Sequence, residues 1–440
     1  MYLIFSLICL CSSAYFFYRA SGSLSPRKMN MISWIFWYSL VIQSFIASVL
    51  VVYNIDNHYG VQKIYFEKSR VQGWLAVQYC MVVLPLSMWV TLIIFKRRIN
   101  NNRVWQSFIQ KDLQSCLTNR DVALRKSFYL LSLICVISVI YSFISVGMFP
   151  FQGYISGGGV SSLRQNVTRD FGGIVYIKNI FGLALTPILS YIFYCYYRLY
   201  KEKNDLIFFV ILFLASVAIV TFDYAKSPLV FYLLGFFFIK VALGDNIDYK
   251  KLFKYFLLTL SLLVGFYILA GYQDTIFSLF NSYNTGLIGR LTISQAFGTY
   301  LAFDLYPIVY SHIGFSSLTD LFGESRDRMA REIMLSVNSQ GIIDGTAGVV
   351  NTLFVAEAWA NFGLLGVIVS VIWVGILVQL IYSTIISSNK NPVILGIYAY
   401  LTYKLPITGG FNDFLYNPAL FLSITLIFLM VWFVKLRVLK

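Results

Sequence analysis

Apolar runs of about 20 residues recur along the whole chain, and they limit its fold more than any other feature. A run of that length, wound as a helix, is long enough to cross the ~30 Å hydrocarbon core of a bilayer. Of the 440 residues, 58% are hydrophobic and 12% are charged, and the mean hydropathy is +0.73. About a quarter of the residues in a soluble domain are charged. The sequence therefore predicts a polytopic membrane protein.

The runs predict an all-α integral membrane protein, with residues 1–440 forming a single transmembrane domain of about eleven helices, within a range of ten to twelve. The first run lacks a basic stretch before it and a clear small-residue cleavage site. We therefore expect a retained helix rather than a signal peptide. The predicted spans cover residues 2–18, 31–53, 74–95, 127–147, 174–197, 206–222, 228–243, 255–270, 351–382, 393–407 and 414–434.

The net charge of +15 is explained by membrane orientation and does not indicate a nucleic-acid partner. When the loops are assigned alternately to two sides, one side holds 22 of the 34 Lys and Arg residues and the other holds nine. Basic residues collect in cytoplasmic loops, so we expect the N-terminus outside and the C-terminus in the cytoplasm. Among the six cysteines, only Cys116 lies outside the predicted spans, and it lies in a cytoplasmic loop. Neither a disulfide framework nor a zinc site or other cofactor is expected.

Three loops differ from simple connections. The cytoplasmic loop at residues 96–126 has a basic sequence with apolar residues at helical spacing, which predicts an amphipathic helix on the inner leaflet. The first outside loop, residues 148–173, has a Gly-rich start and carries Arg164 and Arg169. The second, residues 271–350, is long enough to suggest a function. Its segment GLIGRLTISQAFGTYLAFDLYP has helical spacing. The apolar stripe of the cytoplasmic loop consists of Trp105, Phe108, Ile109, Leu113 and Leu117.

The segment FGESRDRMARE, residues 322–332, is unusually charged for this chain. If it is helical, its charges form i,i+4 ion pairs worth a few tenths of a kcal/mol each. The alternative is an anion site, because the planar guanidinium groups of Arg328 and Arg331 fit phosphate oxygens. The possible pairs are Glu324–Arg328, Asp327–Arg331 and Arg328–Glu332.

Arginine is preferred over lysine in the outside loops. Seven of their nine basic residues are arginine, and the two largest outside loops contain no lysine. Orientation does not require this preference, because long loops are translocated largely regardless of charge. The preference instead favours recognition of phosphate or carboxylate. The seven are Arg70, Arg164, Arg169, Arg290, Arg326, Arg328 and Arg331.

Three further residues are candidates for catalysis. Arg290 has no acidic neighbour one helical turn away, so we expect a ligand anion or a distant carboxylate such as Glu357 to neutralise it. Glu357 lies in an apolar run, where it is either half of a structural ion pair or an active-site carboxylate. His312 is either a polar surface residue or a base for a sugar hydroxyl. At two short outside turns, Asp223 and Lys226 are expected to neutralise each other, and Lys404 and Asp413 to be surface residues.

The arrangement resembles bacterial O-antigen or oligosaccharide repeat-unit polymerases of the Wzy type. The shared features are a large number of spans, an outside loop that carries arginines, and a second, larger outside loop before a late helix. Locally it lies in DYAKSPLVFYLLG, GRLTISQAFGTYLAFDLYP and GTAGVVNTLFVAEAWANFGLLGV. The paired Arg-x10-Gly motifs of many such proteins are not matched, since Val175 and Leu301 follow Arg164 and Arg290 at the glycine positions.

The resemblance implies a GT-C-like helical fold and a glycosyltransferase of the bacterial inner membrane, with the N-terminus in the periplasm. Its substrates would be undecaprenyl-pyrophosphate-linked glycans, joined when an acceptor hydroxyl attacks the donor's anomeric carbon. Arginines would stabilise the leaving pyrophosphate without a metal. Arg290, His312 and Glu357 would be catalytic, and Arg164, Arg169, Arg328 and Arg331 would bind substrate. A flippase and a chain-length regulator of the same pathway would be partners.

Two alternatives remain. An O-antigen ligase is favoured by the spacing of His312 and Gly323, although Ile313 and Arg326 depart from the ligase motif. A flippase for the same lipid-linked units would need charged residues along a path through the membrane midplane. Most charged residues of this chain lie in loops, which favours the enzyme.

Overall fold

Helices are the only regular elements in the part of the chain that the computed structural model describes. The side chains of residues 101–102, 262–263 and 266–269 are not described. The residues outside the description are 56, 96–100, 118–120, 148–166, 168–170, 224, 226, 270–285, 319–327, 344–346 and 437–440.

Eight helical stretches among the described residues are long and apolar enough to cross a membrane. Helices suit these sequences because all backbone groups can be hydrogen-bonded within the segment. The helices α11 (Ser227–Leu243), α12 (Tyr249–Leu269) and α19 (Pro392–Lys404) overlap the other three predicted spans. The all-helical polytopic architecture is confirmed, while the number eleven stays a prediction. The eight stretches are Tyr2–Lys28, Met31–Val52, Glu67–Ile94, Asp121–Ile144, Ile177–Tyr200, Lys203–Val220, Val355–Ser387 and Asn412–Leu436.

The chain divides into two compact units. Unit 1 consists of Met1–Trp105, Gln273–Thr384 and Leu405–Asn417. Unit 2 consists of Gln106–Tyr272, Ile385–Lys404 and Pro418–Lys440. Each unit thus combines segments that lie far apart in the sequence.

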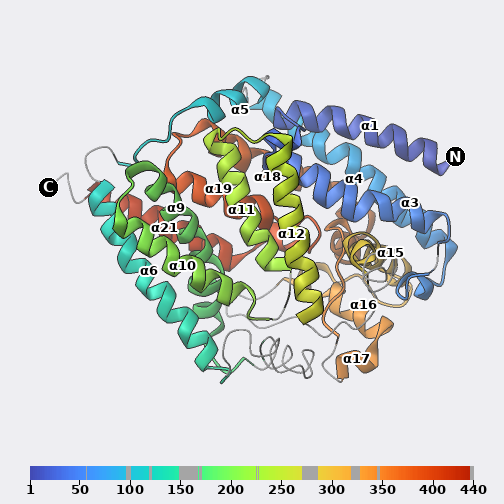
Figure 1. The fold of residues 1–440 in the computed structure, drawn as a ribbon. Coiled ribbons are helices and arrows are strands. Elements are labelled where there is room, and N and C mark those ends of the chain that lie inside the picture. Colours follow the sequence, from blue (N-terminus) through green and yellow to red (C-terminus); the bar gives the residue numbers. More distant parts are fainter. Residues whose placement is uncertain are drawn as a thin grey trace. The chain divides into compact units, whose positions relative to one another are not determined.

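Unit 1 is built around the long helix α4, which packs against α1, α3 and α15. Figure 1 shows α1, α3 and α4 as neighbours. A buried cluster that includes Trp74 of α4 and Tyr300 of α15 fills the space between these two helices. The helices of unit 1 are α1 (Tyr2–Ser21), α2 (Met31–Trp34), the π-helix η2 (Ile35–Phe45), α3 (Ile46–Val52), α4 (Glu67–Ile94), α14 (Leu287–Leu291), α15 (Ile293–Leu305), α16 (Met329–Val337), α17 (Ser339–Ile343), most of α18 (Val355–Ser387) and α20 (Asn412–Leu415), with short 3₁₀ turns at Pro26–Lys28, Val61–Lys63 and Gly314–Ser317.

The helical spacing predicted for residues 286–307 is confirmed by α14 and α15. Asp304, fully buried near the end of α15, fixes this segment to the start of α4. Its carboxylate oxygens accept hydrogen bonds from the backbone N–H groups of Tyr65 and Phe66, at 2.9 and 3.0 Å. Amides just before a helix lack partners within the helix, so a carboxylate is a suitable acceptor there.

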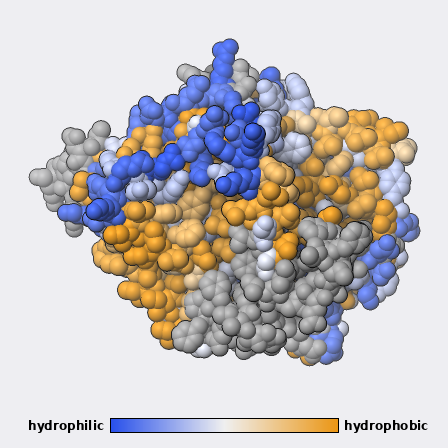
Figure 2. All heavy atoms as spheres, in the orientation of Figure 1, coloured by the Kyte–Doolittle hydropathy of each residue, from blue (hydrophilic) through white to orange (hydrophobic). Residues whose placement is uncertain are grey.

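Unit 2 is centred on α9, which continues from a π-helix, η4, and packs against α10 and α19. The side of α6 that faces away from the rest of unit 2 is apolar: Leu130, Leu133, Ile137 and Ile144 are exposed. Figure 2 shows hydrophobic residues on the visible surface of α6, as expected for a lipid-facing helix. The helices of this unit are α6 (Asp121–Ile144), η4 (Ile177–Leu185), α9 (Thr186–Tyr200), α10 (Lys203–Val220), α11, α12, α19 and α21 (Pro418–Leu436).

The loop at residues 96–126, predicted to be cytoplasmic, is helical over only part of its described length. Its helix, α5 (Asn101–Gln110), is short, and the side chains of Trp105 and Phe108 are fully buried. Within unit 2, the buried ammonium group of Lys390 donates to the carbonyls of Phe108 and Lys111, at 3.3 and 2.7 Å. Burial lowers the pKa of Lys390 to about 8. The two aromatic residues of the stripe therefore pack against protein, while Ile109, Leu113 and Leu117 are partly exposed.

Candidate functional site

The site lies in unit 1, around the start of α18. This helix is broken at Gly363, whose φ of 60° and ψ of −145° are not helical. Such a backbone conformation is available almost only to glycine. Residues 364–387 form a helix about 36 Å long, which is enough to cross the hydrocarbon core alone. The short segment 355–362, which carries Glu357, therefore precedes the part of α18 that can span the membrane.

The break in α18 frees backbone carbonyls, and the segment around His312 uses one of them. The Ala360 carbonyl accepts a hydrogen bond from the backbone N–H of Ile313 at 3.0 Å, and the imidazole Nδ1 of His312 lies 3.2 Å from it. A carbonyl only accepts hydrogen bonds, so Nδ1 carries a proton, and in the neutral form of the ring Nε2 has the lone pair. The His312 ring also packs edge-on against Trp359, with 5.9 Å between centroids. The exposed imidazole is thus fixed in orientation.

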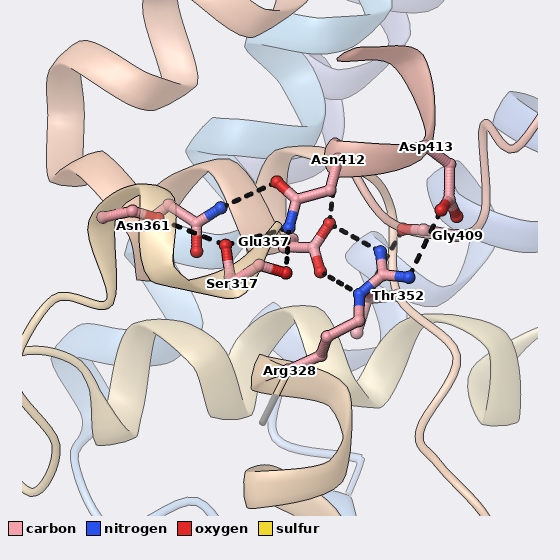
Figure 3. A network of polar contacts seen from close by, with 9 residues as sticks. Ser317, Arg328, Thr352, Glu357, Asn361, Gly409, Asn412 and Asp413 are labelled. Carbon is pink, nitrogen blue, oxygen red and sulfur yellow. Dashed lines mark hydrogen bonds and ion pairs between the residues drawn. The ribbon is translucent and has the colours of Figure 1, made fainter. Parts of the chain in front are cut away.

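Arg328 and Glu357 form the centre of the site (Figure 3). Arg328 donates from Nε and Nη2 to the two oxygens of Glu357, at 2.9 and 3.0 Å. The Glu357 side chain is 1% exposed, so it needs this paired cation. Burial alone would lower the pKa of Arg328, but the hydrogen bonds and charges of its carboxylate partners raise it above its usual range. The cation that the sequence predicts for Glu357 is therefore Arg328.

Asp413 binds the other side of the same guanidinium. Arg328 Nη1 donates to Asp413 Oδ1 at 3.2 Å, and the Asp413 side chain is 33% exposed. The prediction that Asp413 is a simple surface residue is wrong, because α20 places it at this ion pair. With both carboxylates ionised, the three side chains carry one net negative charge.

Amide side chains extend the cluster. The backbone N–H of Asn412 donates to Glu357 Oε2 at 2.9 Å, and its side-chain amide donates to Ser317 Oγ at the same distance. Asn361 donates to the Asn412 side-chain oxygen at 3.0 Å. As Figure 3 shows, residues from the large loop, from α18 and from α20 meet here. Gly410 passes so close that a methyl group on it would overlap Arg328 and Glu357.

The predicted pair between Arg328 and Glu332 is wrong. Helix α16 begins at Met329, and Arg328 precedes it with an extended backbone, φ −102° and ψ 145°. Its side chain is therefore directed away from the next turn, and Glu332 instead accepts a hydrogen bond from the Tyr306 hydroxyl. The partners predicted for Arg328 and Arg331 on their N-terminal side, Glu324 and Asp327, lie outside the described residues, as does Arg326.

The other predicted site residues are placed as follows. Arg290 is exposed at the end of α14. It lies near Tyr59: burial raises the pKa of Tyr59, and the charge of Arg290 partly opposes that effect. Glu357, suggested as a distant partner of Arg290, is paired with Arg328 instead. Arg331 is exposed on α16. Arg164, Arg169, Lys226 and Gly323 lie outside the described residues.

The structure brings Arg328, Glu357 and His312 to the first segment of α18, and it adds residues that sequence reasoning missed. Asp413 and Asn412 belong to the turn TGGFND, in which Gly410 allows the backbone to approach the ion pair. Gly410 was the available signal in the sequence. Ser317 gave none, since a serine in a polar loop is ordinary.

Comparisons with models of known protein families, with curated proteins and with solved structures find no match to this chain.

Proposed function

We propose that this chain is a glycosyltransferase that polymerises undecaprenyl-pyrophosphate-linked oligosaccharide units at the periplasmic face of the bacterial inner membrane. The observation that supports this best is the cluster of Arg328, Glu357 and Asp413 beside the membrane-crossing part of α18, with an oriented His312 on the same segment. A lipid-linked glycan places its pyrophosphate and sugars at the membrane boundary and its tail among the lipids. Polar reactive groups at a helix end, within an otherwise apolar molecule, suit such a substrate.

In the proposed reaction, the acceptor hydroxyl attacks the anomeric carbon of the donor, a new C–O bond forms, and the bond to pyrophosphate breaks. Negative charge develops on the leaving pyrophosphate, which arginine side chains can stabilise. Arg328 is neutralised by two carboxylates. Arg290 and Arg331 are exposed and so can be reached by a substrate, and we assign that role to them. The bases at the site are the carboxylates and His312 Nε2.

A flippase is less well supported. Beyond Glu357 in its first turn, α18 has no charged residue. A transporter for a charged headgroup would need polar groups along its pathway near the membrane midplane. In α18 the charge lies at one end, which favours chemistry at the membrane boundary.

The proposal is tested in cells of the native host. Deletion of the gene should leave only single-unit glycans, and the intact chain should restore a polymer ladder. Full-length polymer that accumulates on its lipid carrier after deletion would indicate a ligase instead, and unchanged surface glycan would refute both.

Arg290→Lys keeps the charge but removes the planar fork of the guanidinium. At equal protein level it should shorten or weaken the ladder strongly. Lys68→Gln, which changes another exposed basic residue of unit 1, is the control and should leave the ladder unchanged. A normal ladder from Arg290→Lys would show that Arg290 does not hold the pyrophosphate through two hydrogen bonds.

A further inference from the structure

The two carboxylates of the cluster differ in the number of hydrogen bonds that they accept and in their exposure. Both Glu357 oxygens accept hydrogen bonds from Arg328, and Oε2 also accepts from the backbone N–H of Asn412. With a side chain that is 1% exposed, Glu357 is closed to a substrate. Asp413 uses Oδ1 for Arg328, and its side chain is 33% exposed. The backbone of Gly410 also hydrogen-bonds to the Asp413 carboxylate. Among the described residues no side chain donates to Asp413 Oδ2, so Asp413 is the more accessible carboxylate of the cluster.

The net charge of the cluster indicates which part of the substrate the cluster can bind. Its net charge of −1 repels a pyrophosphate, so the cluster is unsuited to the leaving group. An ionised carboxylate only accepts hydrogen bonds, and its natural partner on a glycan is a hydroxyl group. The cluster therefore suits the acceptor sugar, while the leaving pyrophosphate requires a separate group of arginines.

The geometry points to Asp413 as the general base of the proposed transfer, with Arg328 and Glu357 as positioning residues. The acceptor hydroxyl donates its proton to Asp413 Oδ2 as its oxygen bonds to the anomeric carbon. The pyrophosphate leaves with the electron pair of the broken C–O bond, and Asp413 then releases the proton to water. Arg328 holds Oδ1, and Glu357 holds Arg328, so Oδ2 is fixed in place.

This inference rests on the proposed function. An assay of purified protein with lipid-linked single units from the deletion strain distinguishes a failure of the inference from a failure of the proposed function. If the intact chain forms no polymer, the proposed function fails. If it does, Asp413→Asn should lower kcat by about 10²–10⁴-fold, the usual contribution of a general base, with the donor KM within threefold. The amide oxygen of the variant side chain can still accept from Arg328, so the fold is retained. Glu67→Gln, at a side chain that is 76% exposed, is the matched carboxylate-to-amide control and should keep kcat unchanged.

The positioning role has its own test. Arg328→Lys should lower kcat, but it should add almost nothing to the loss in Asp413→Asn, because the residue acts through Asp413. Losses that multiply in the double variant would overturn the positioning role.

The assignment of the base is overturned if Asp413→Asn keeps kcat within threefold of the intact chain. It is also overturned if that variant raises only the donor KM. Loss of kcat in His312→Gln together with a normal Asp413→Asn variant would identify the imidazole as the base instead.

Discussion

At the scale of the residue, the carboxylate partners of Arg328 determine whether its side chain can bind an anion. The sequence suggests a phosphate ligand or a member of local helix pairs. Instead, the guanidinium lies between Glu357 and Asp413, which come from segments far along the chain. A cation held by two carboxylates adds no positive potential for an anion, so its contribution is to order the site.

Removal of this cation should destabilise unit 1. Arg328→Gln leaves Glu357 buried without its charged partner, a change that typically costs about 3–5 kcal/mol. We expect a clearly lower unfolding temperature in detergent. Arg331→Gln, at an exposed arginine three residues away, should leave the unfolding temperature close to that of the intact chain. Equal unfolding temperatures for both variants would mean that the Arg328–Glu357 pair contributes no stability.

At the scale of the element, hydropathy predicted where the helices are, because a run of about 20 apolar residues has few other solutions in a bilayer. The break in α18 could not be predicted, since Gly363 is one of several glycines in apolar runs and its role appears only in contact with His312. The start of α16 at Met329 was also missed, and that shift of a few residues removed the Arg328–Glu332 pair. Asp413 was missed because its partner is 85 residues away.

The loop between α3 and α4 provides a pH-dependent contribution to stability. His58 is fully buried, and burial lowers its pKa to about 4. Its Nδ1 accepts from the Gly60 N–H at 3.2 Å, so Nε2 donates to the Ser294 hydroxyl at 3.0 Å. Protonation of Nδ1 would break the first of these bonds.

Because the folded pKa of His58 lies below the unfolded value of about 6.5, the unfolded chain binds a proton more readily between these pH values. The contribution is complete above about pH 6.5 and is lost as the pH falls towards about 4. Between about pH 7 and pH 5 the intact chain should lose roughly 2 kcal/mol of stability through this residue. Unfolding in detergent at both pH values should show a smaller loss for His58→Gln. The same pH dependence in both proteins would contradict a neutral, buried His58.

At the scale of the whole molecule, the proposed function requires the large loop and the loop at residues 96–126 to lie on opposite sides of the membrane. A reporter inserted after Lys111 should be cytoplasmic, and one inserted after Ser316 should be periplasmic. The expectation follows from the excess of Lys and Arg in one set of loops. If both reporters were on one side, the membrane orientation of the candidate site would be wrong.

Polymer formation by the purified chain alone in liposomes would show directly that this chain is the polymerase. Lipid-linked single units from the deletion strain are added without a nucleotide, and the lipid-linked products are separated by size. We expect a ladder of products that differ by one repeat unit, with release of one undecaprenyl pyrophosphate for each bond formed. Single units that remain unjoined, or that only move between leaflets, would contradict the proposed function.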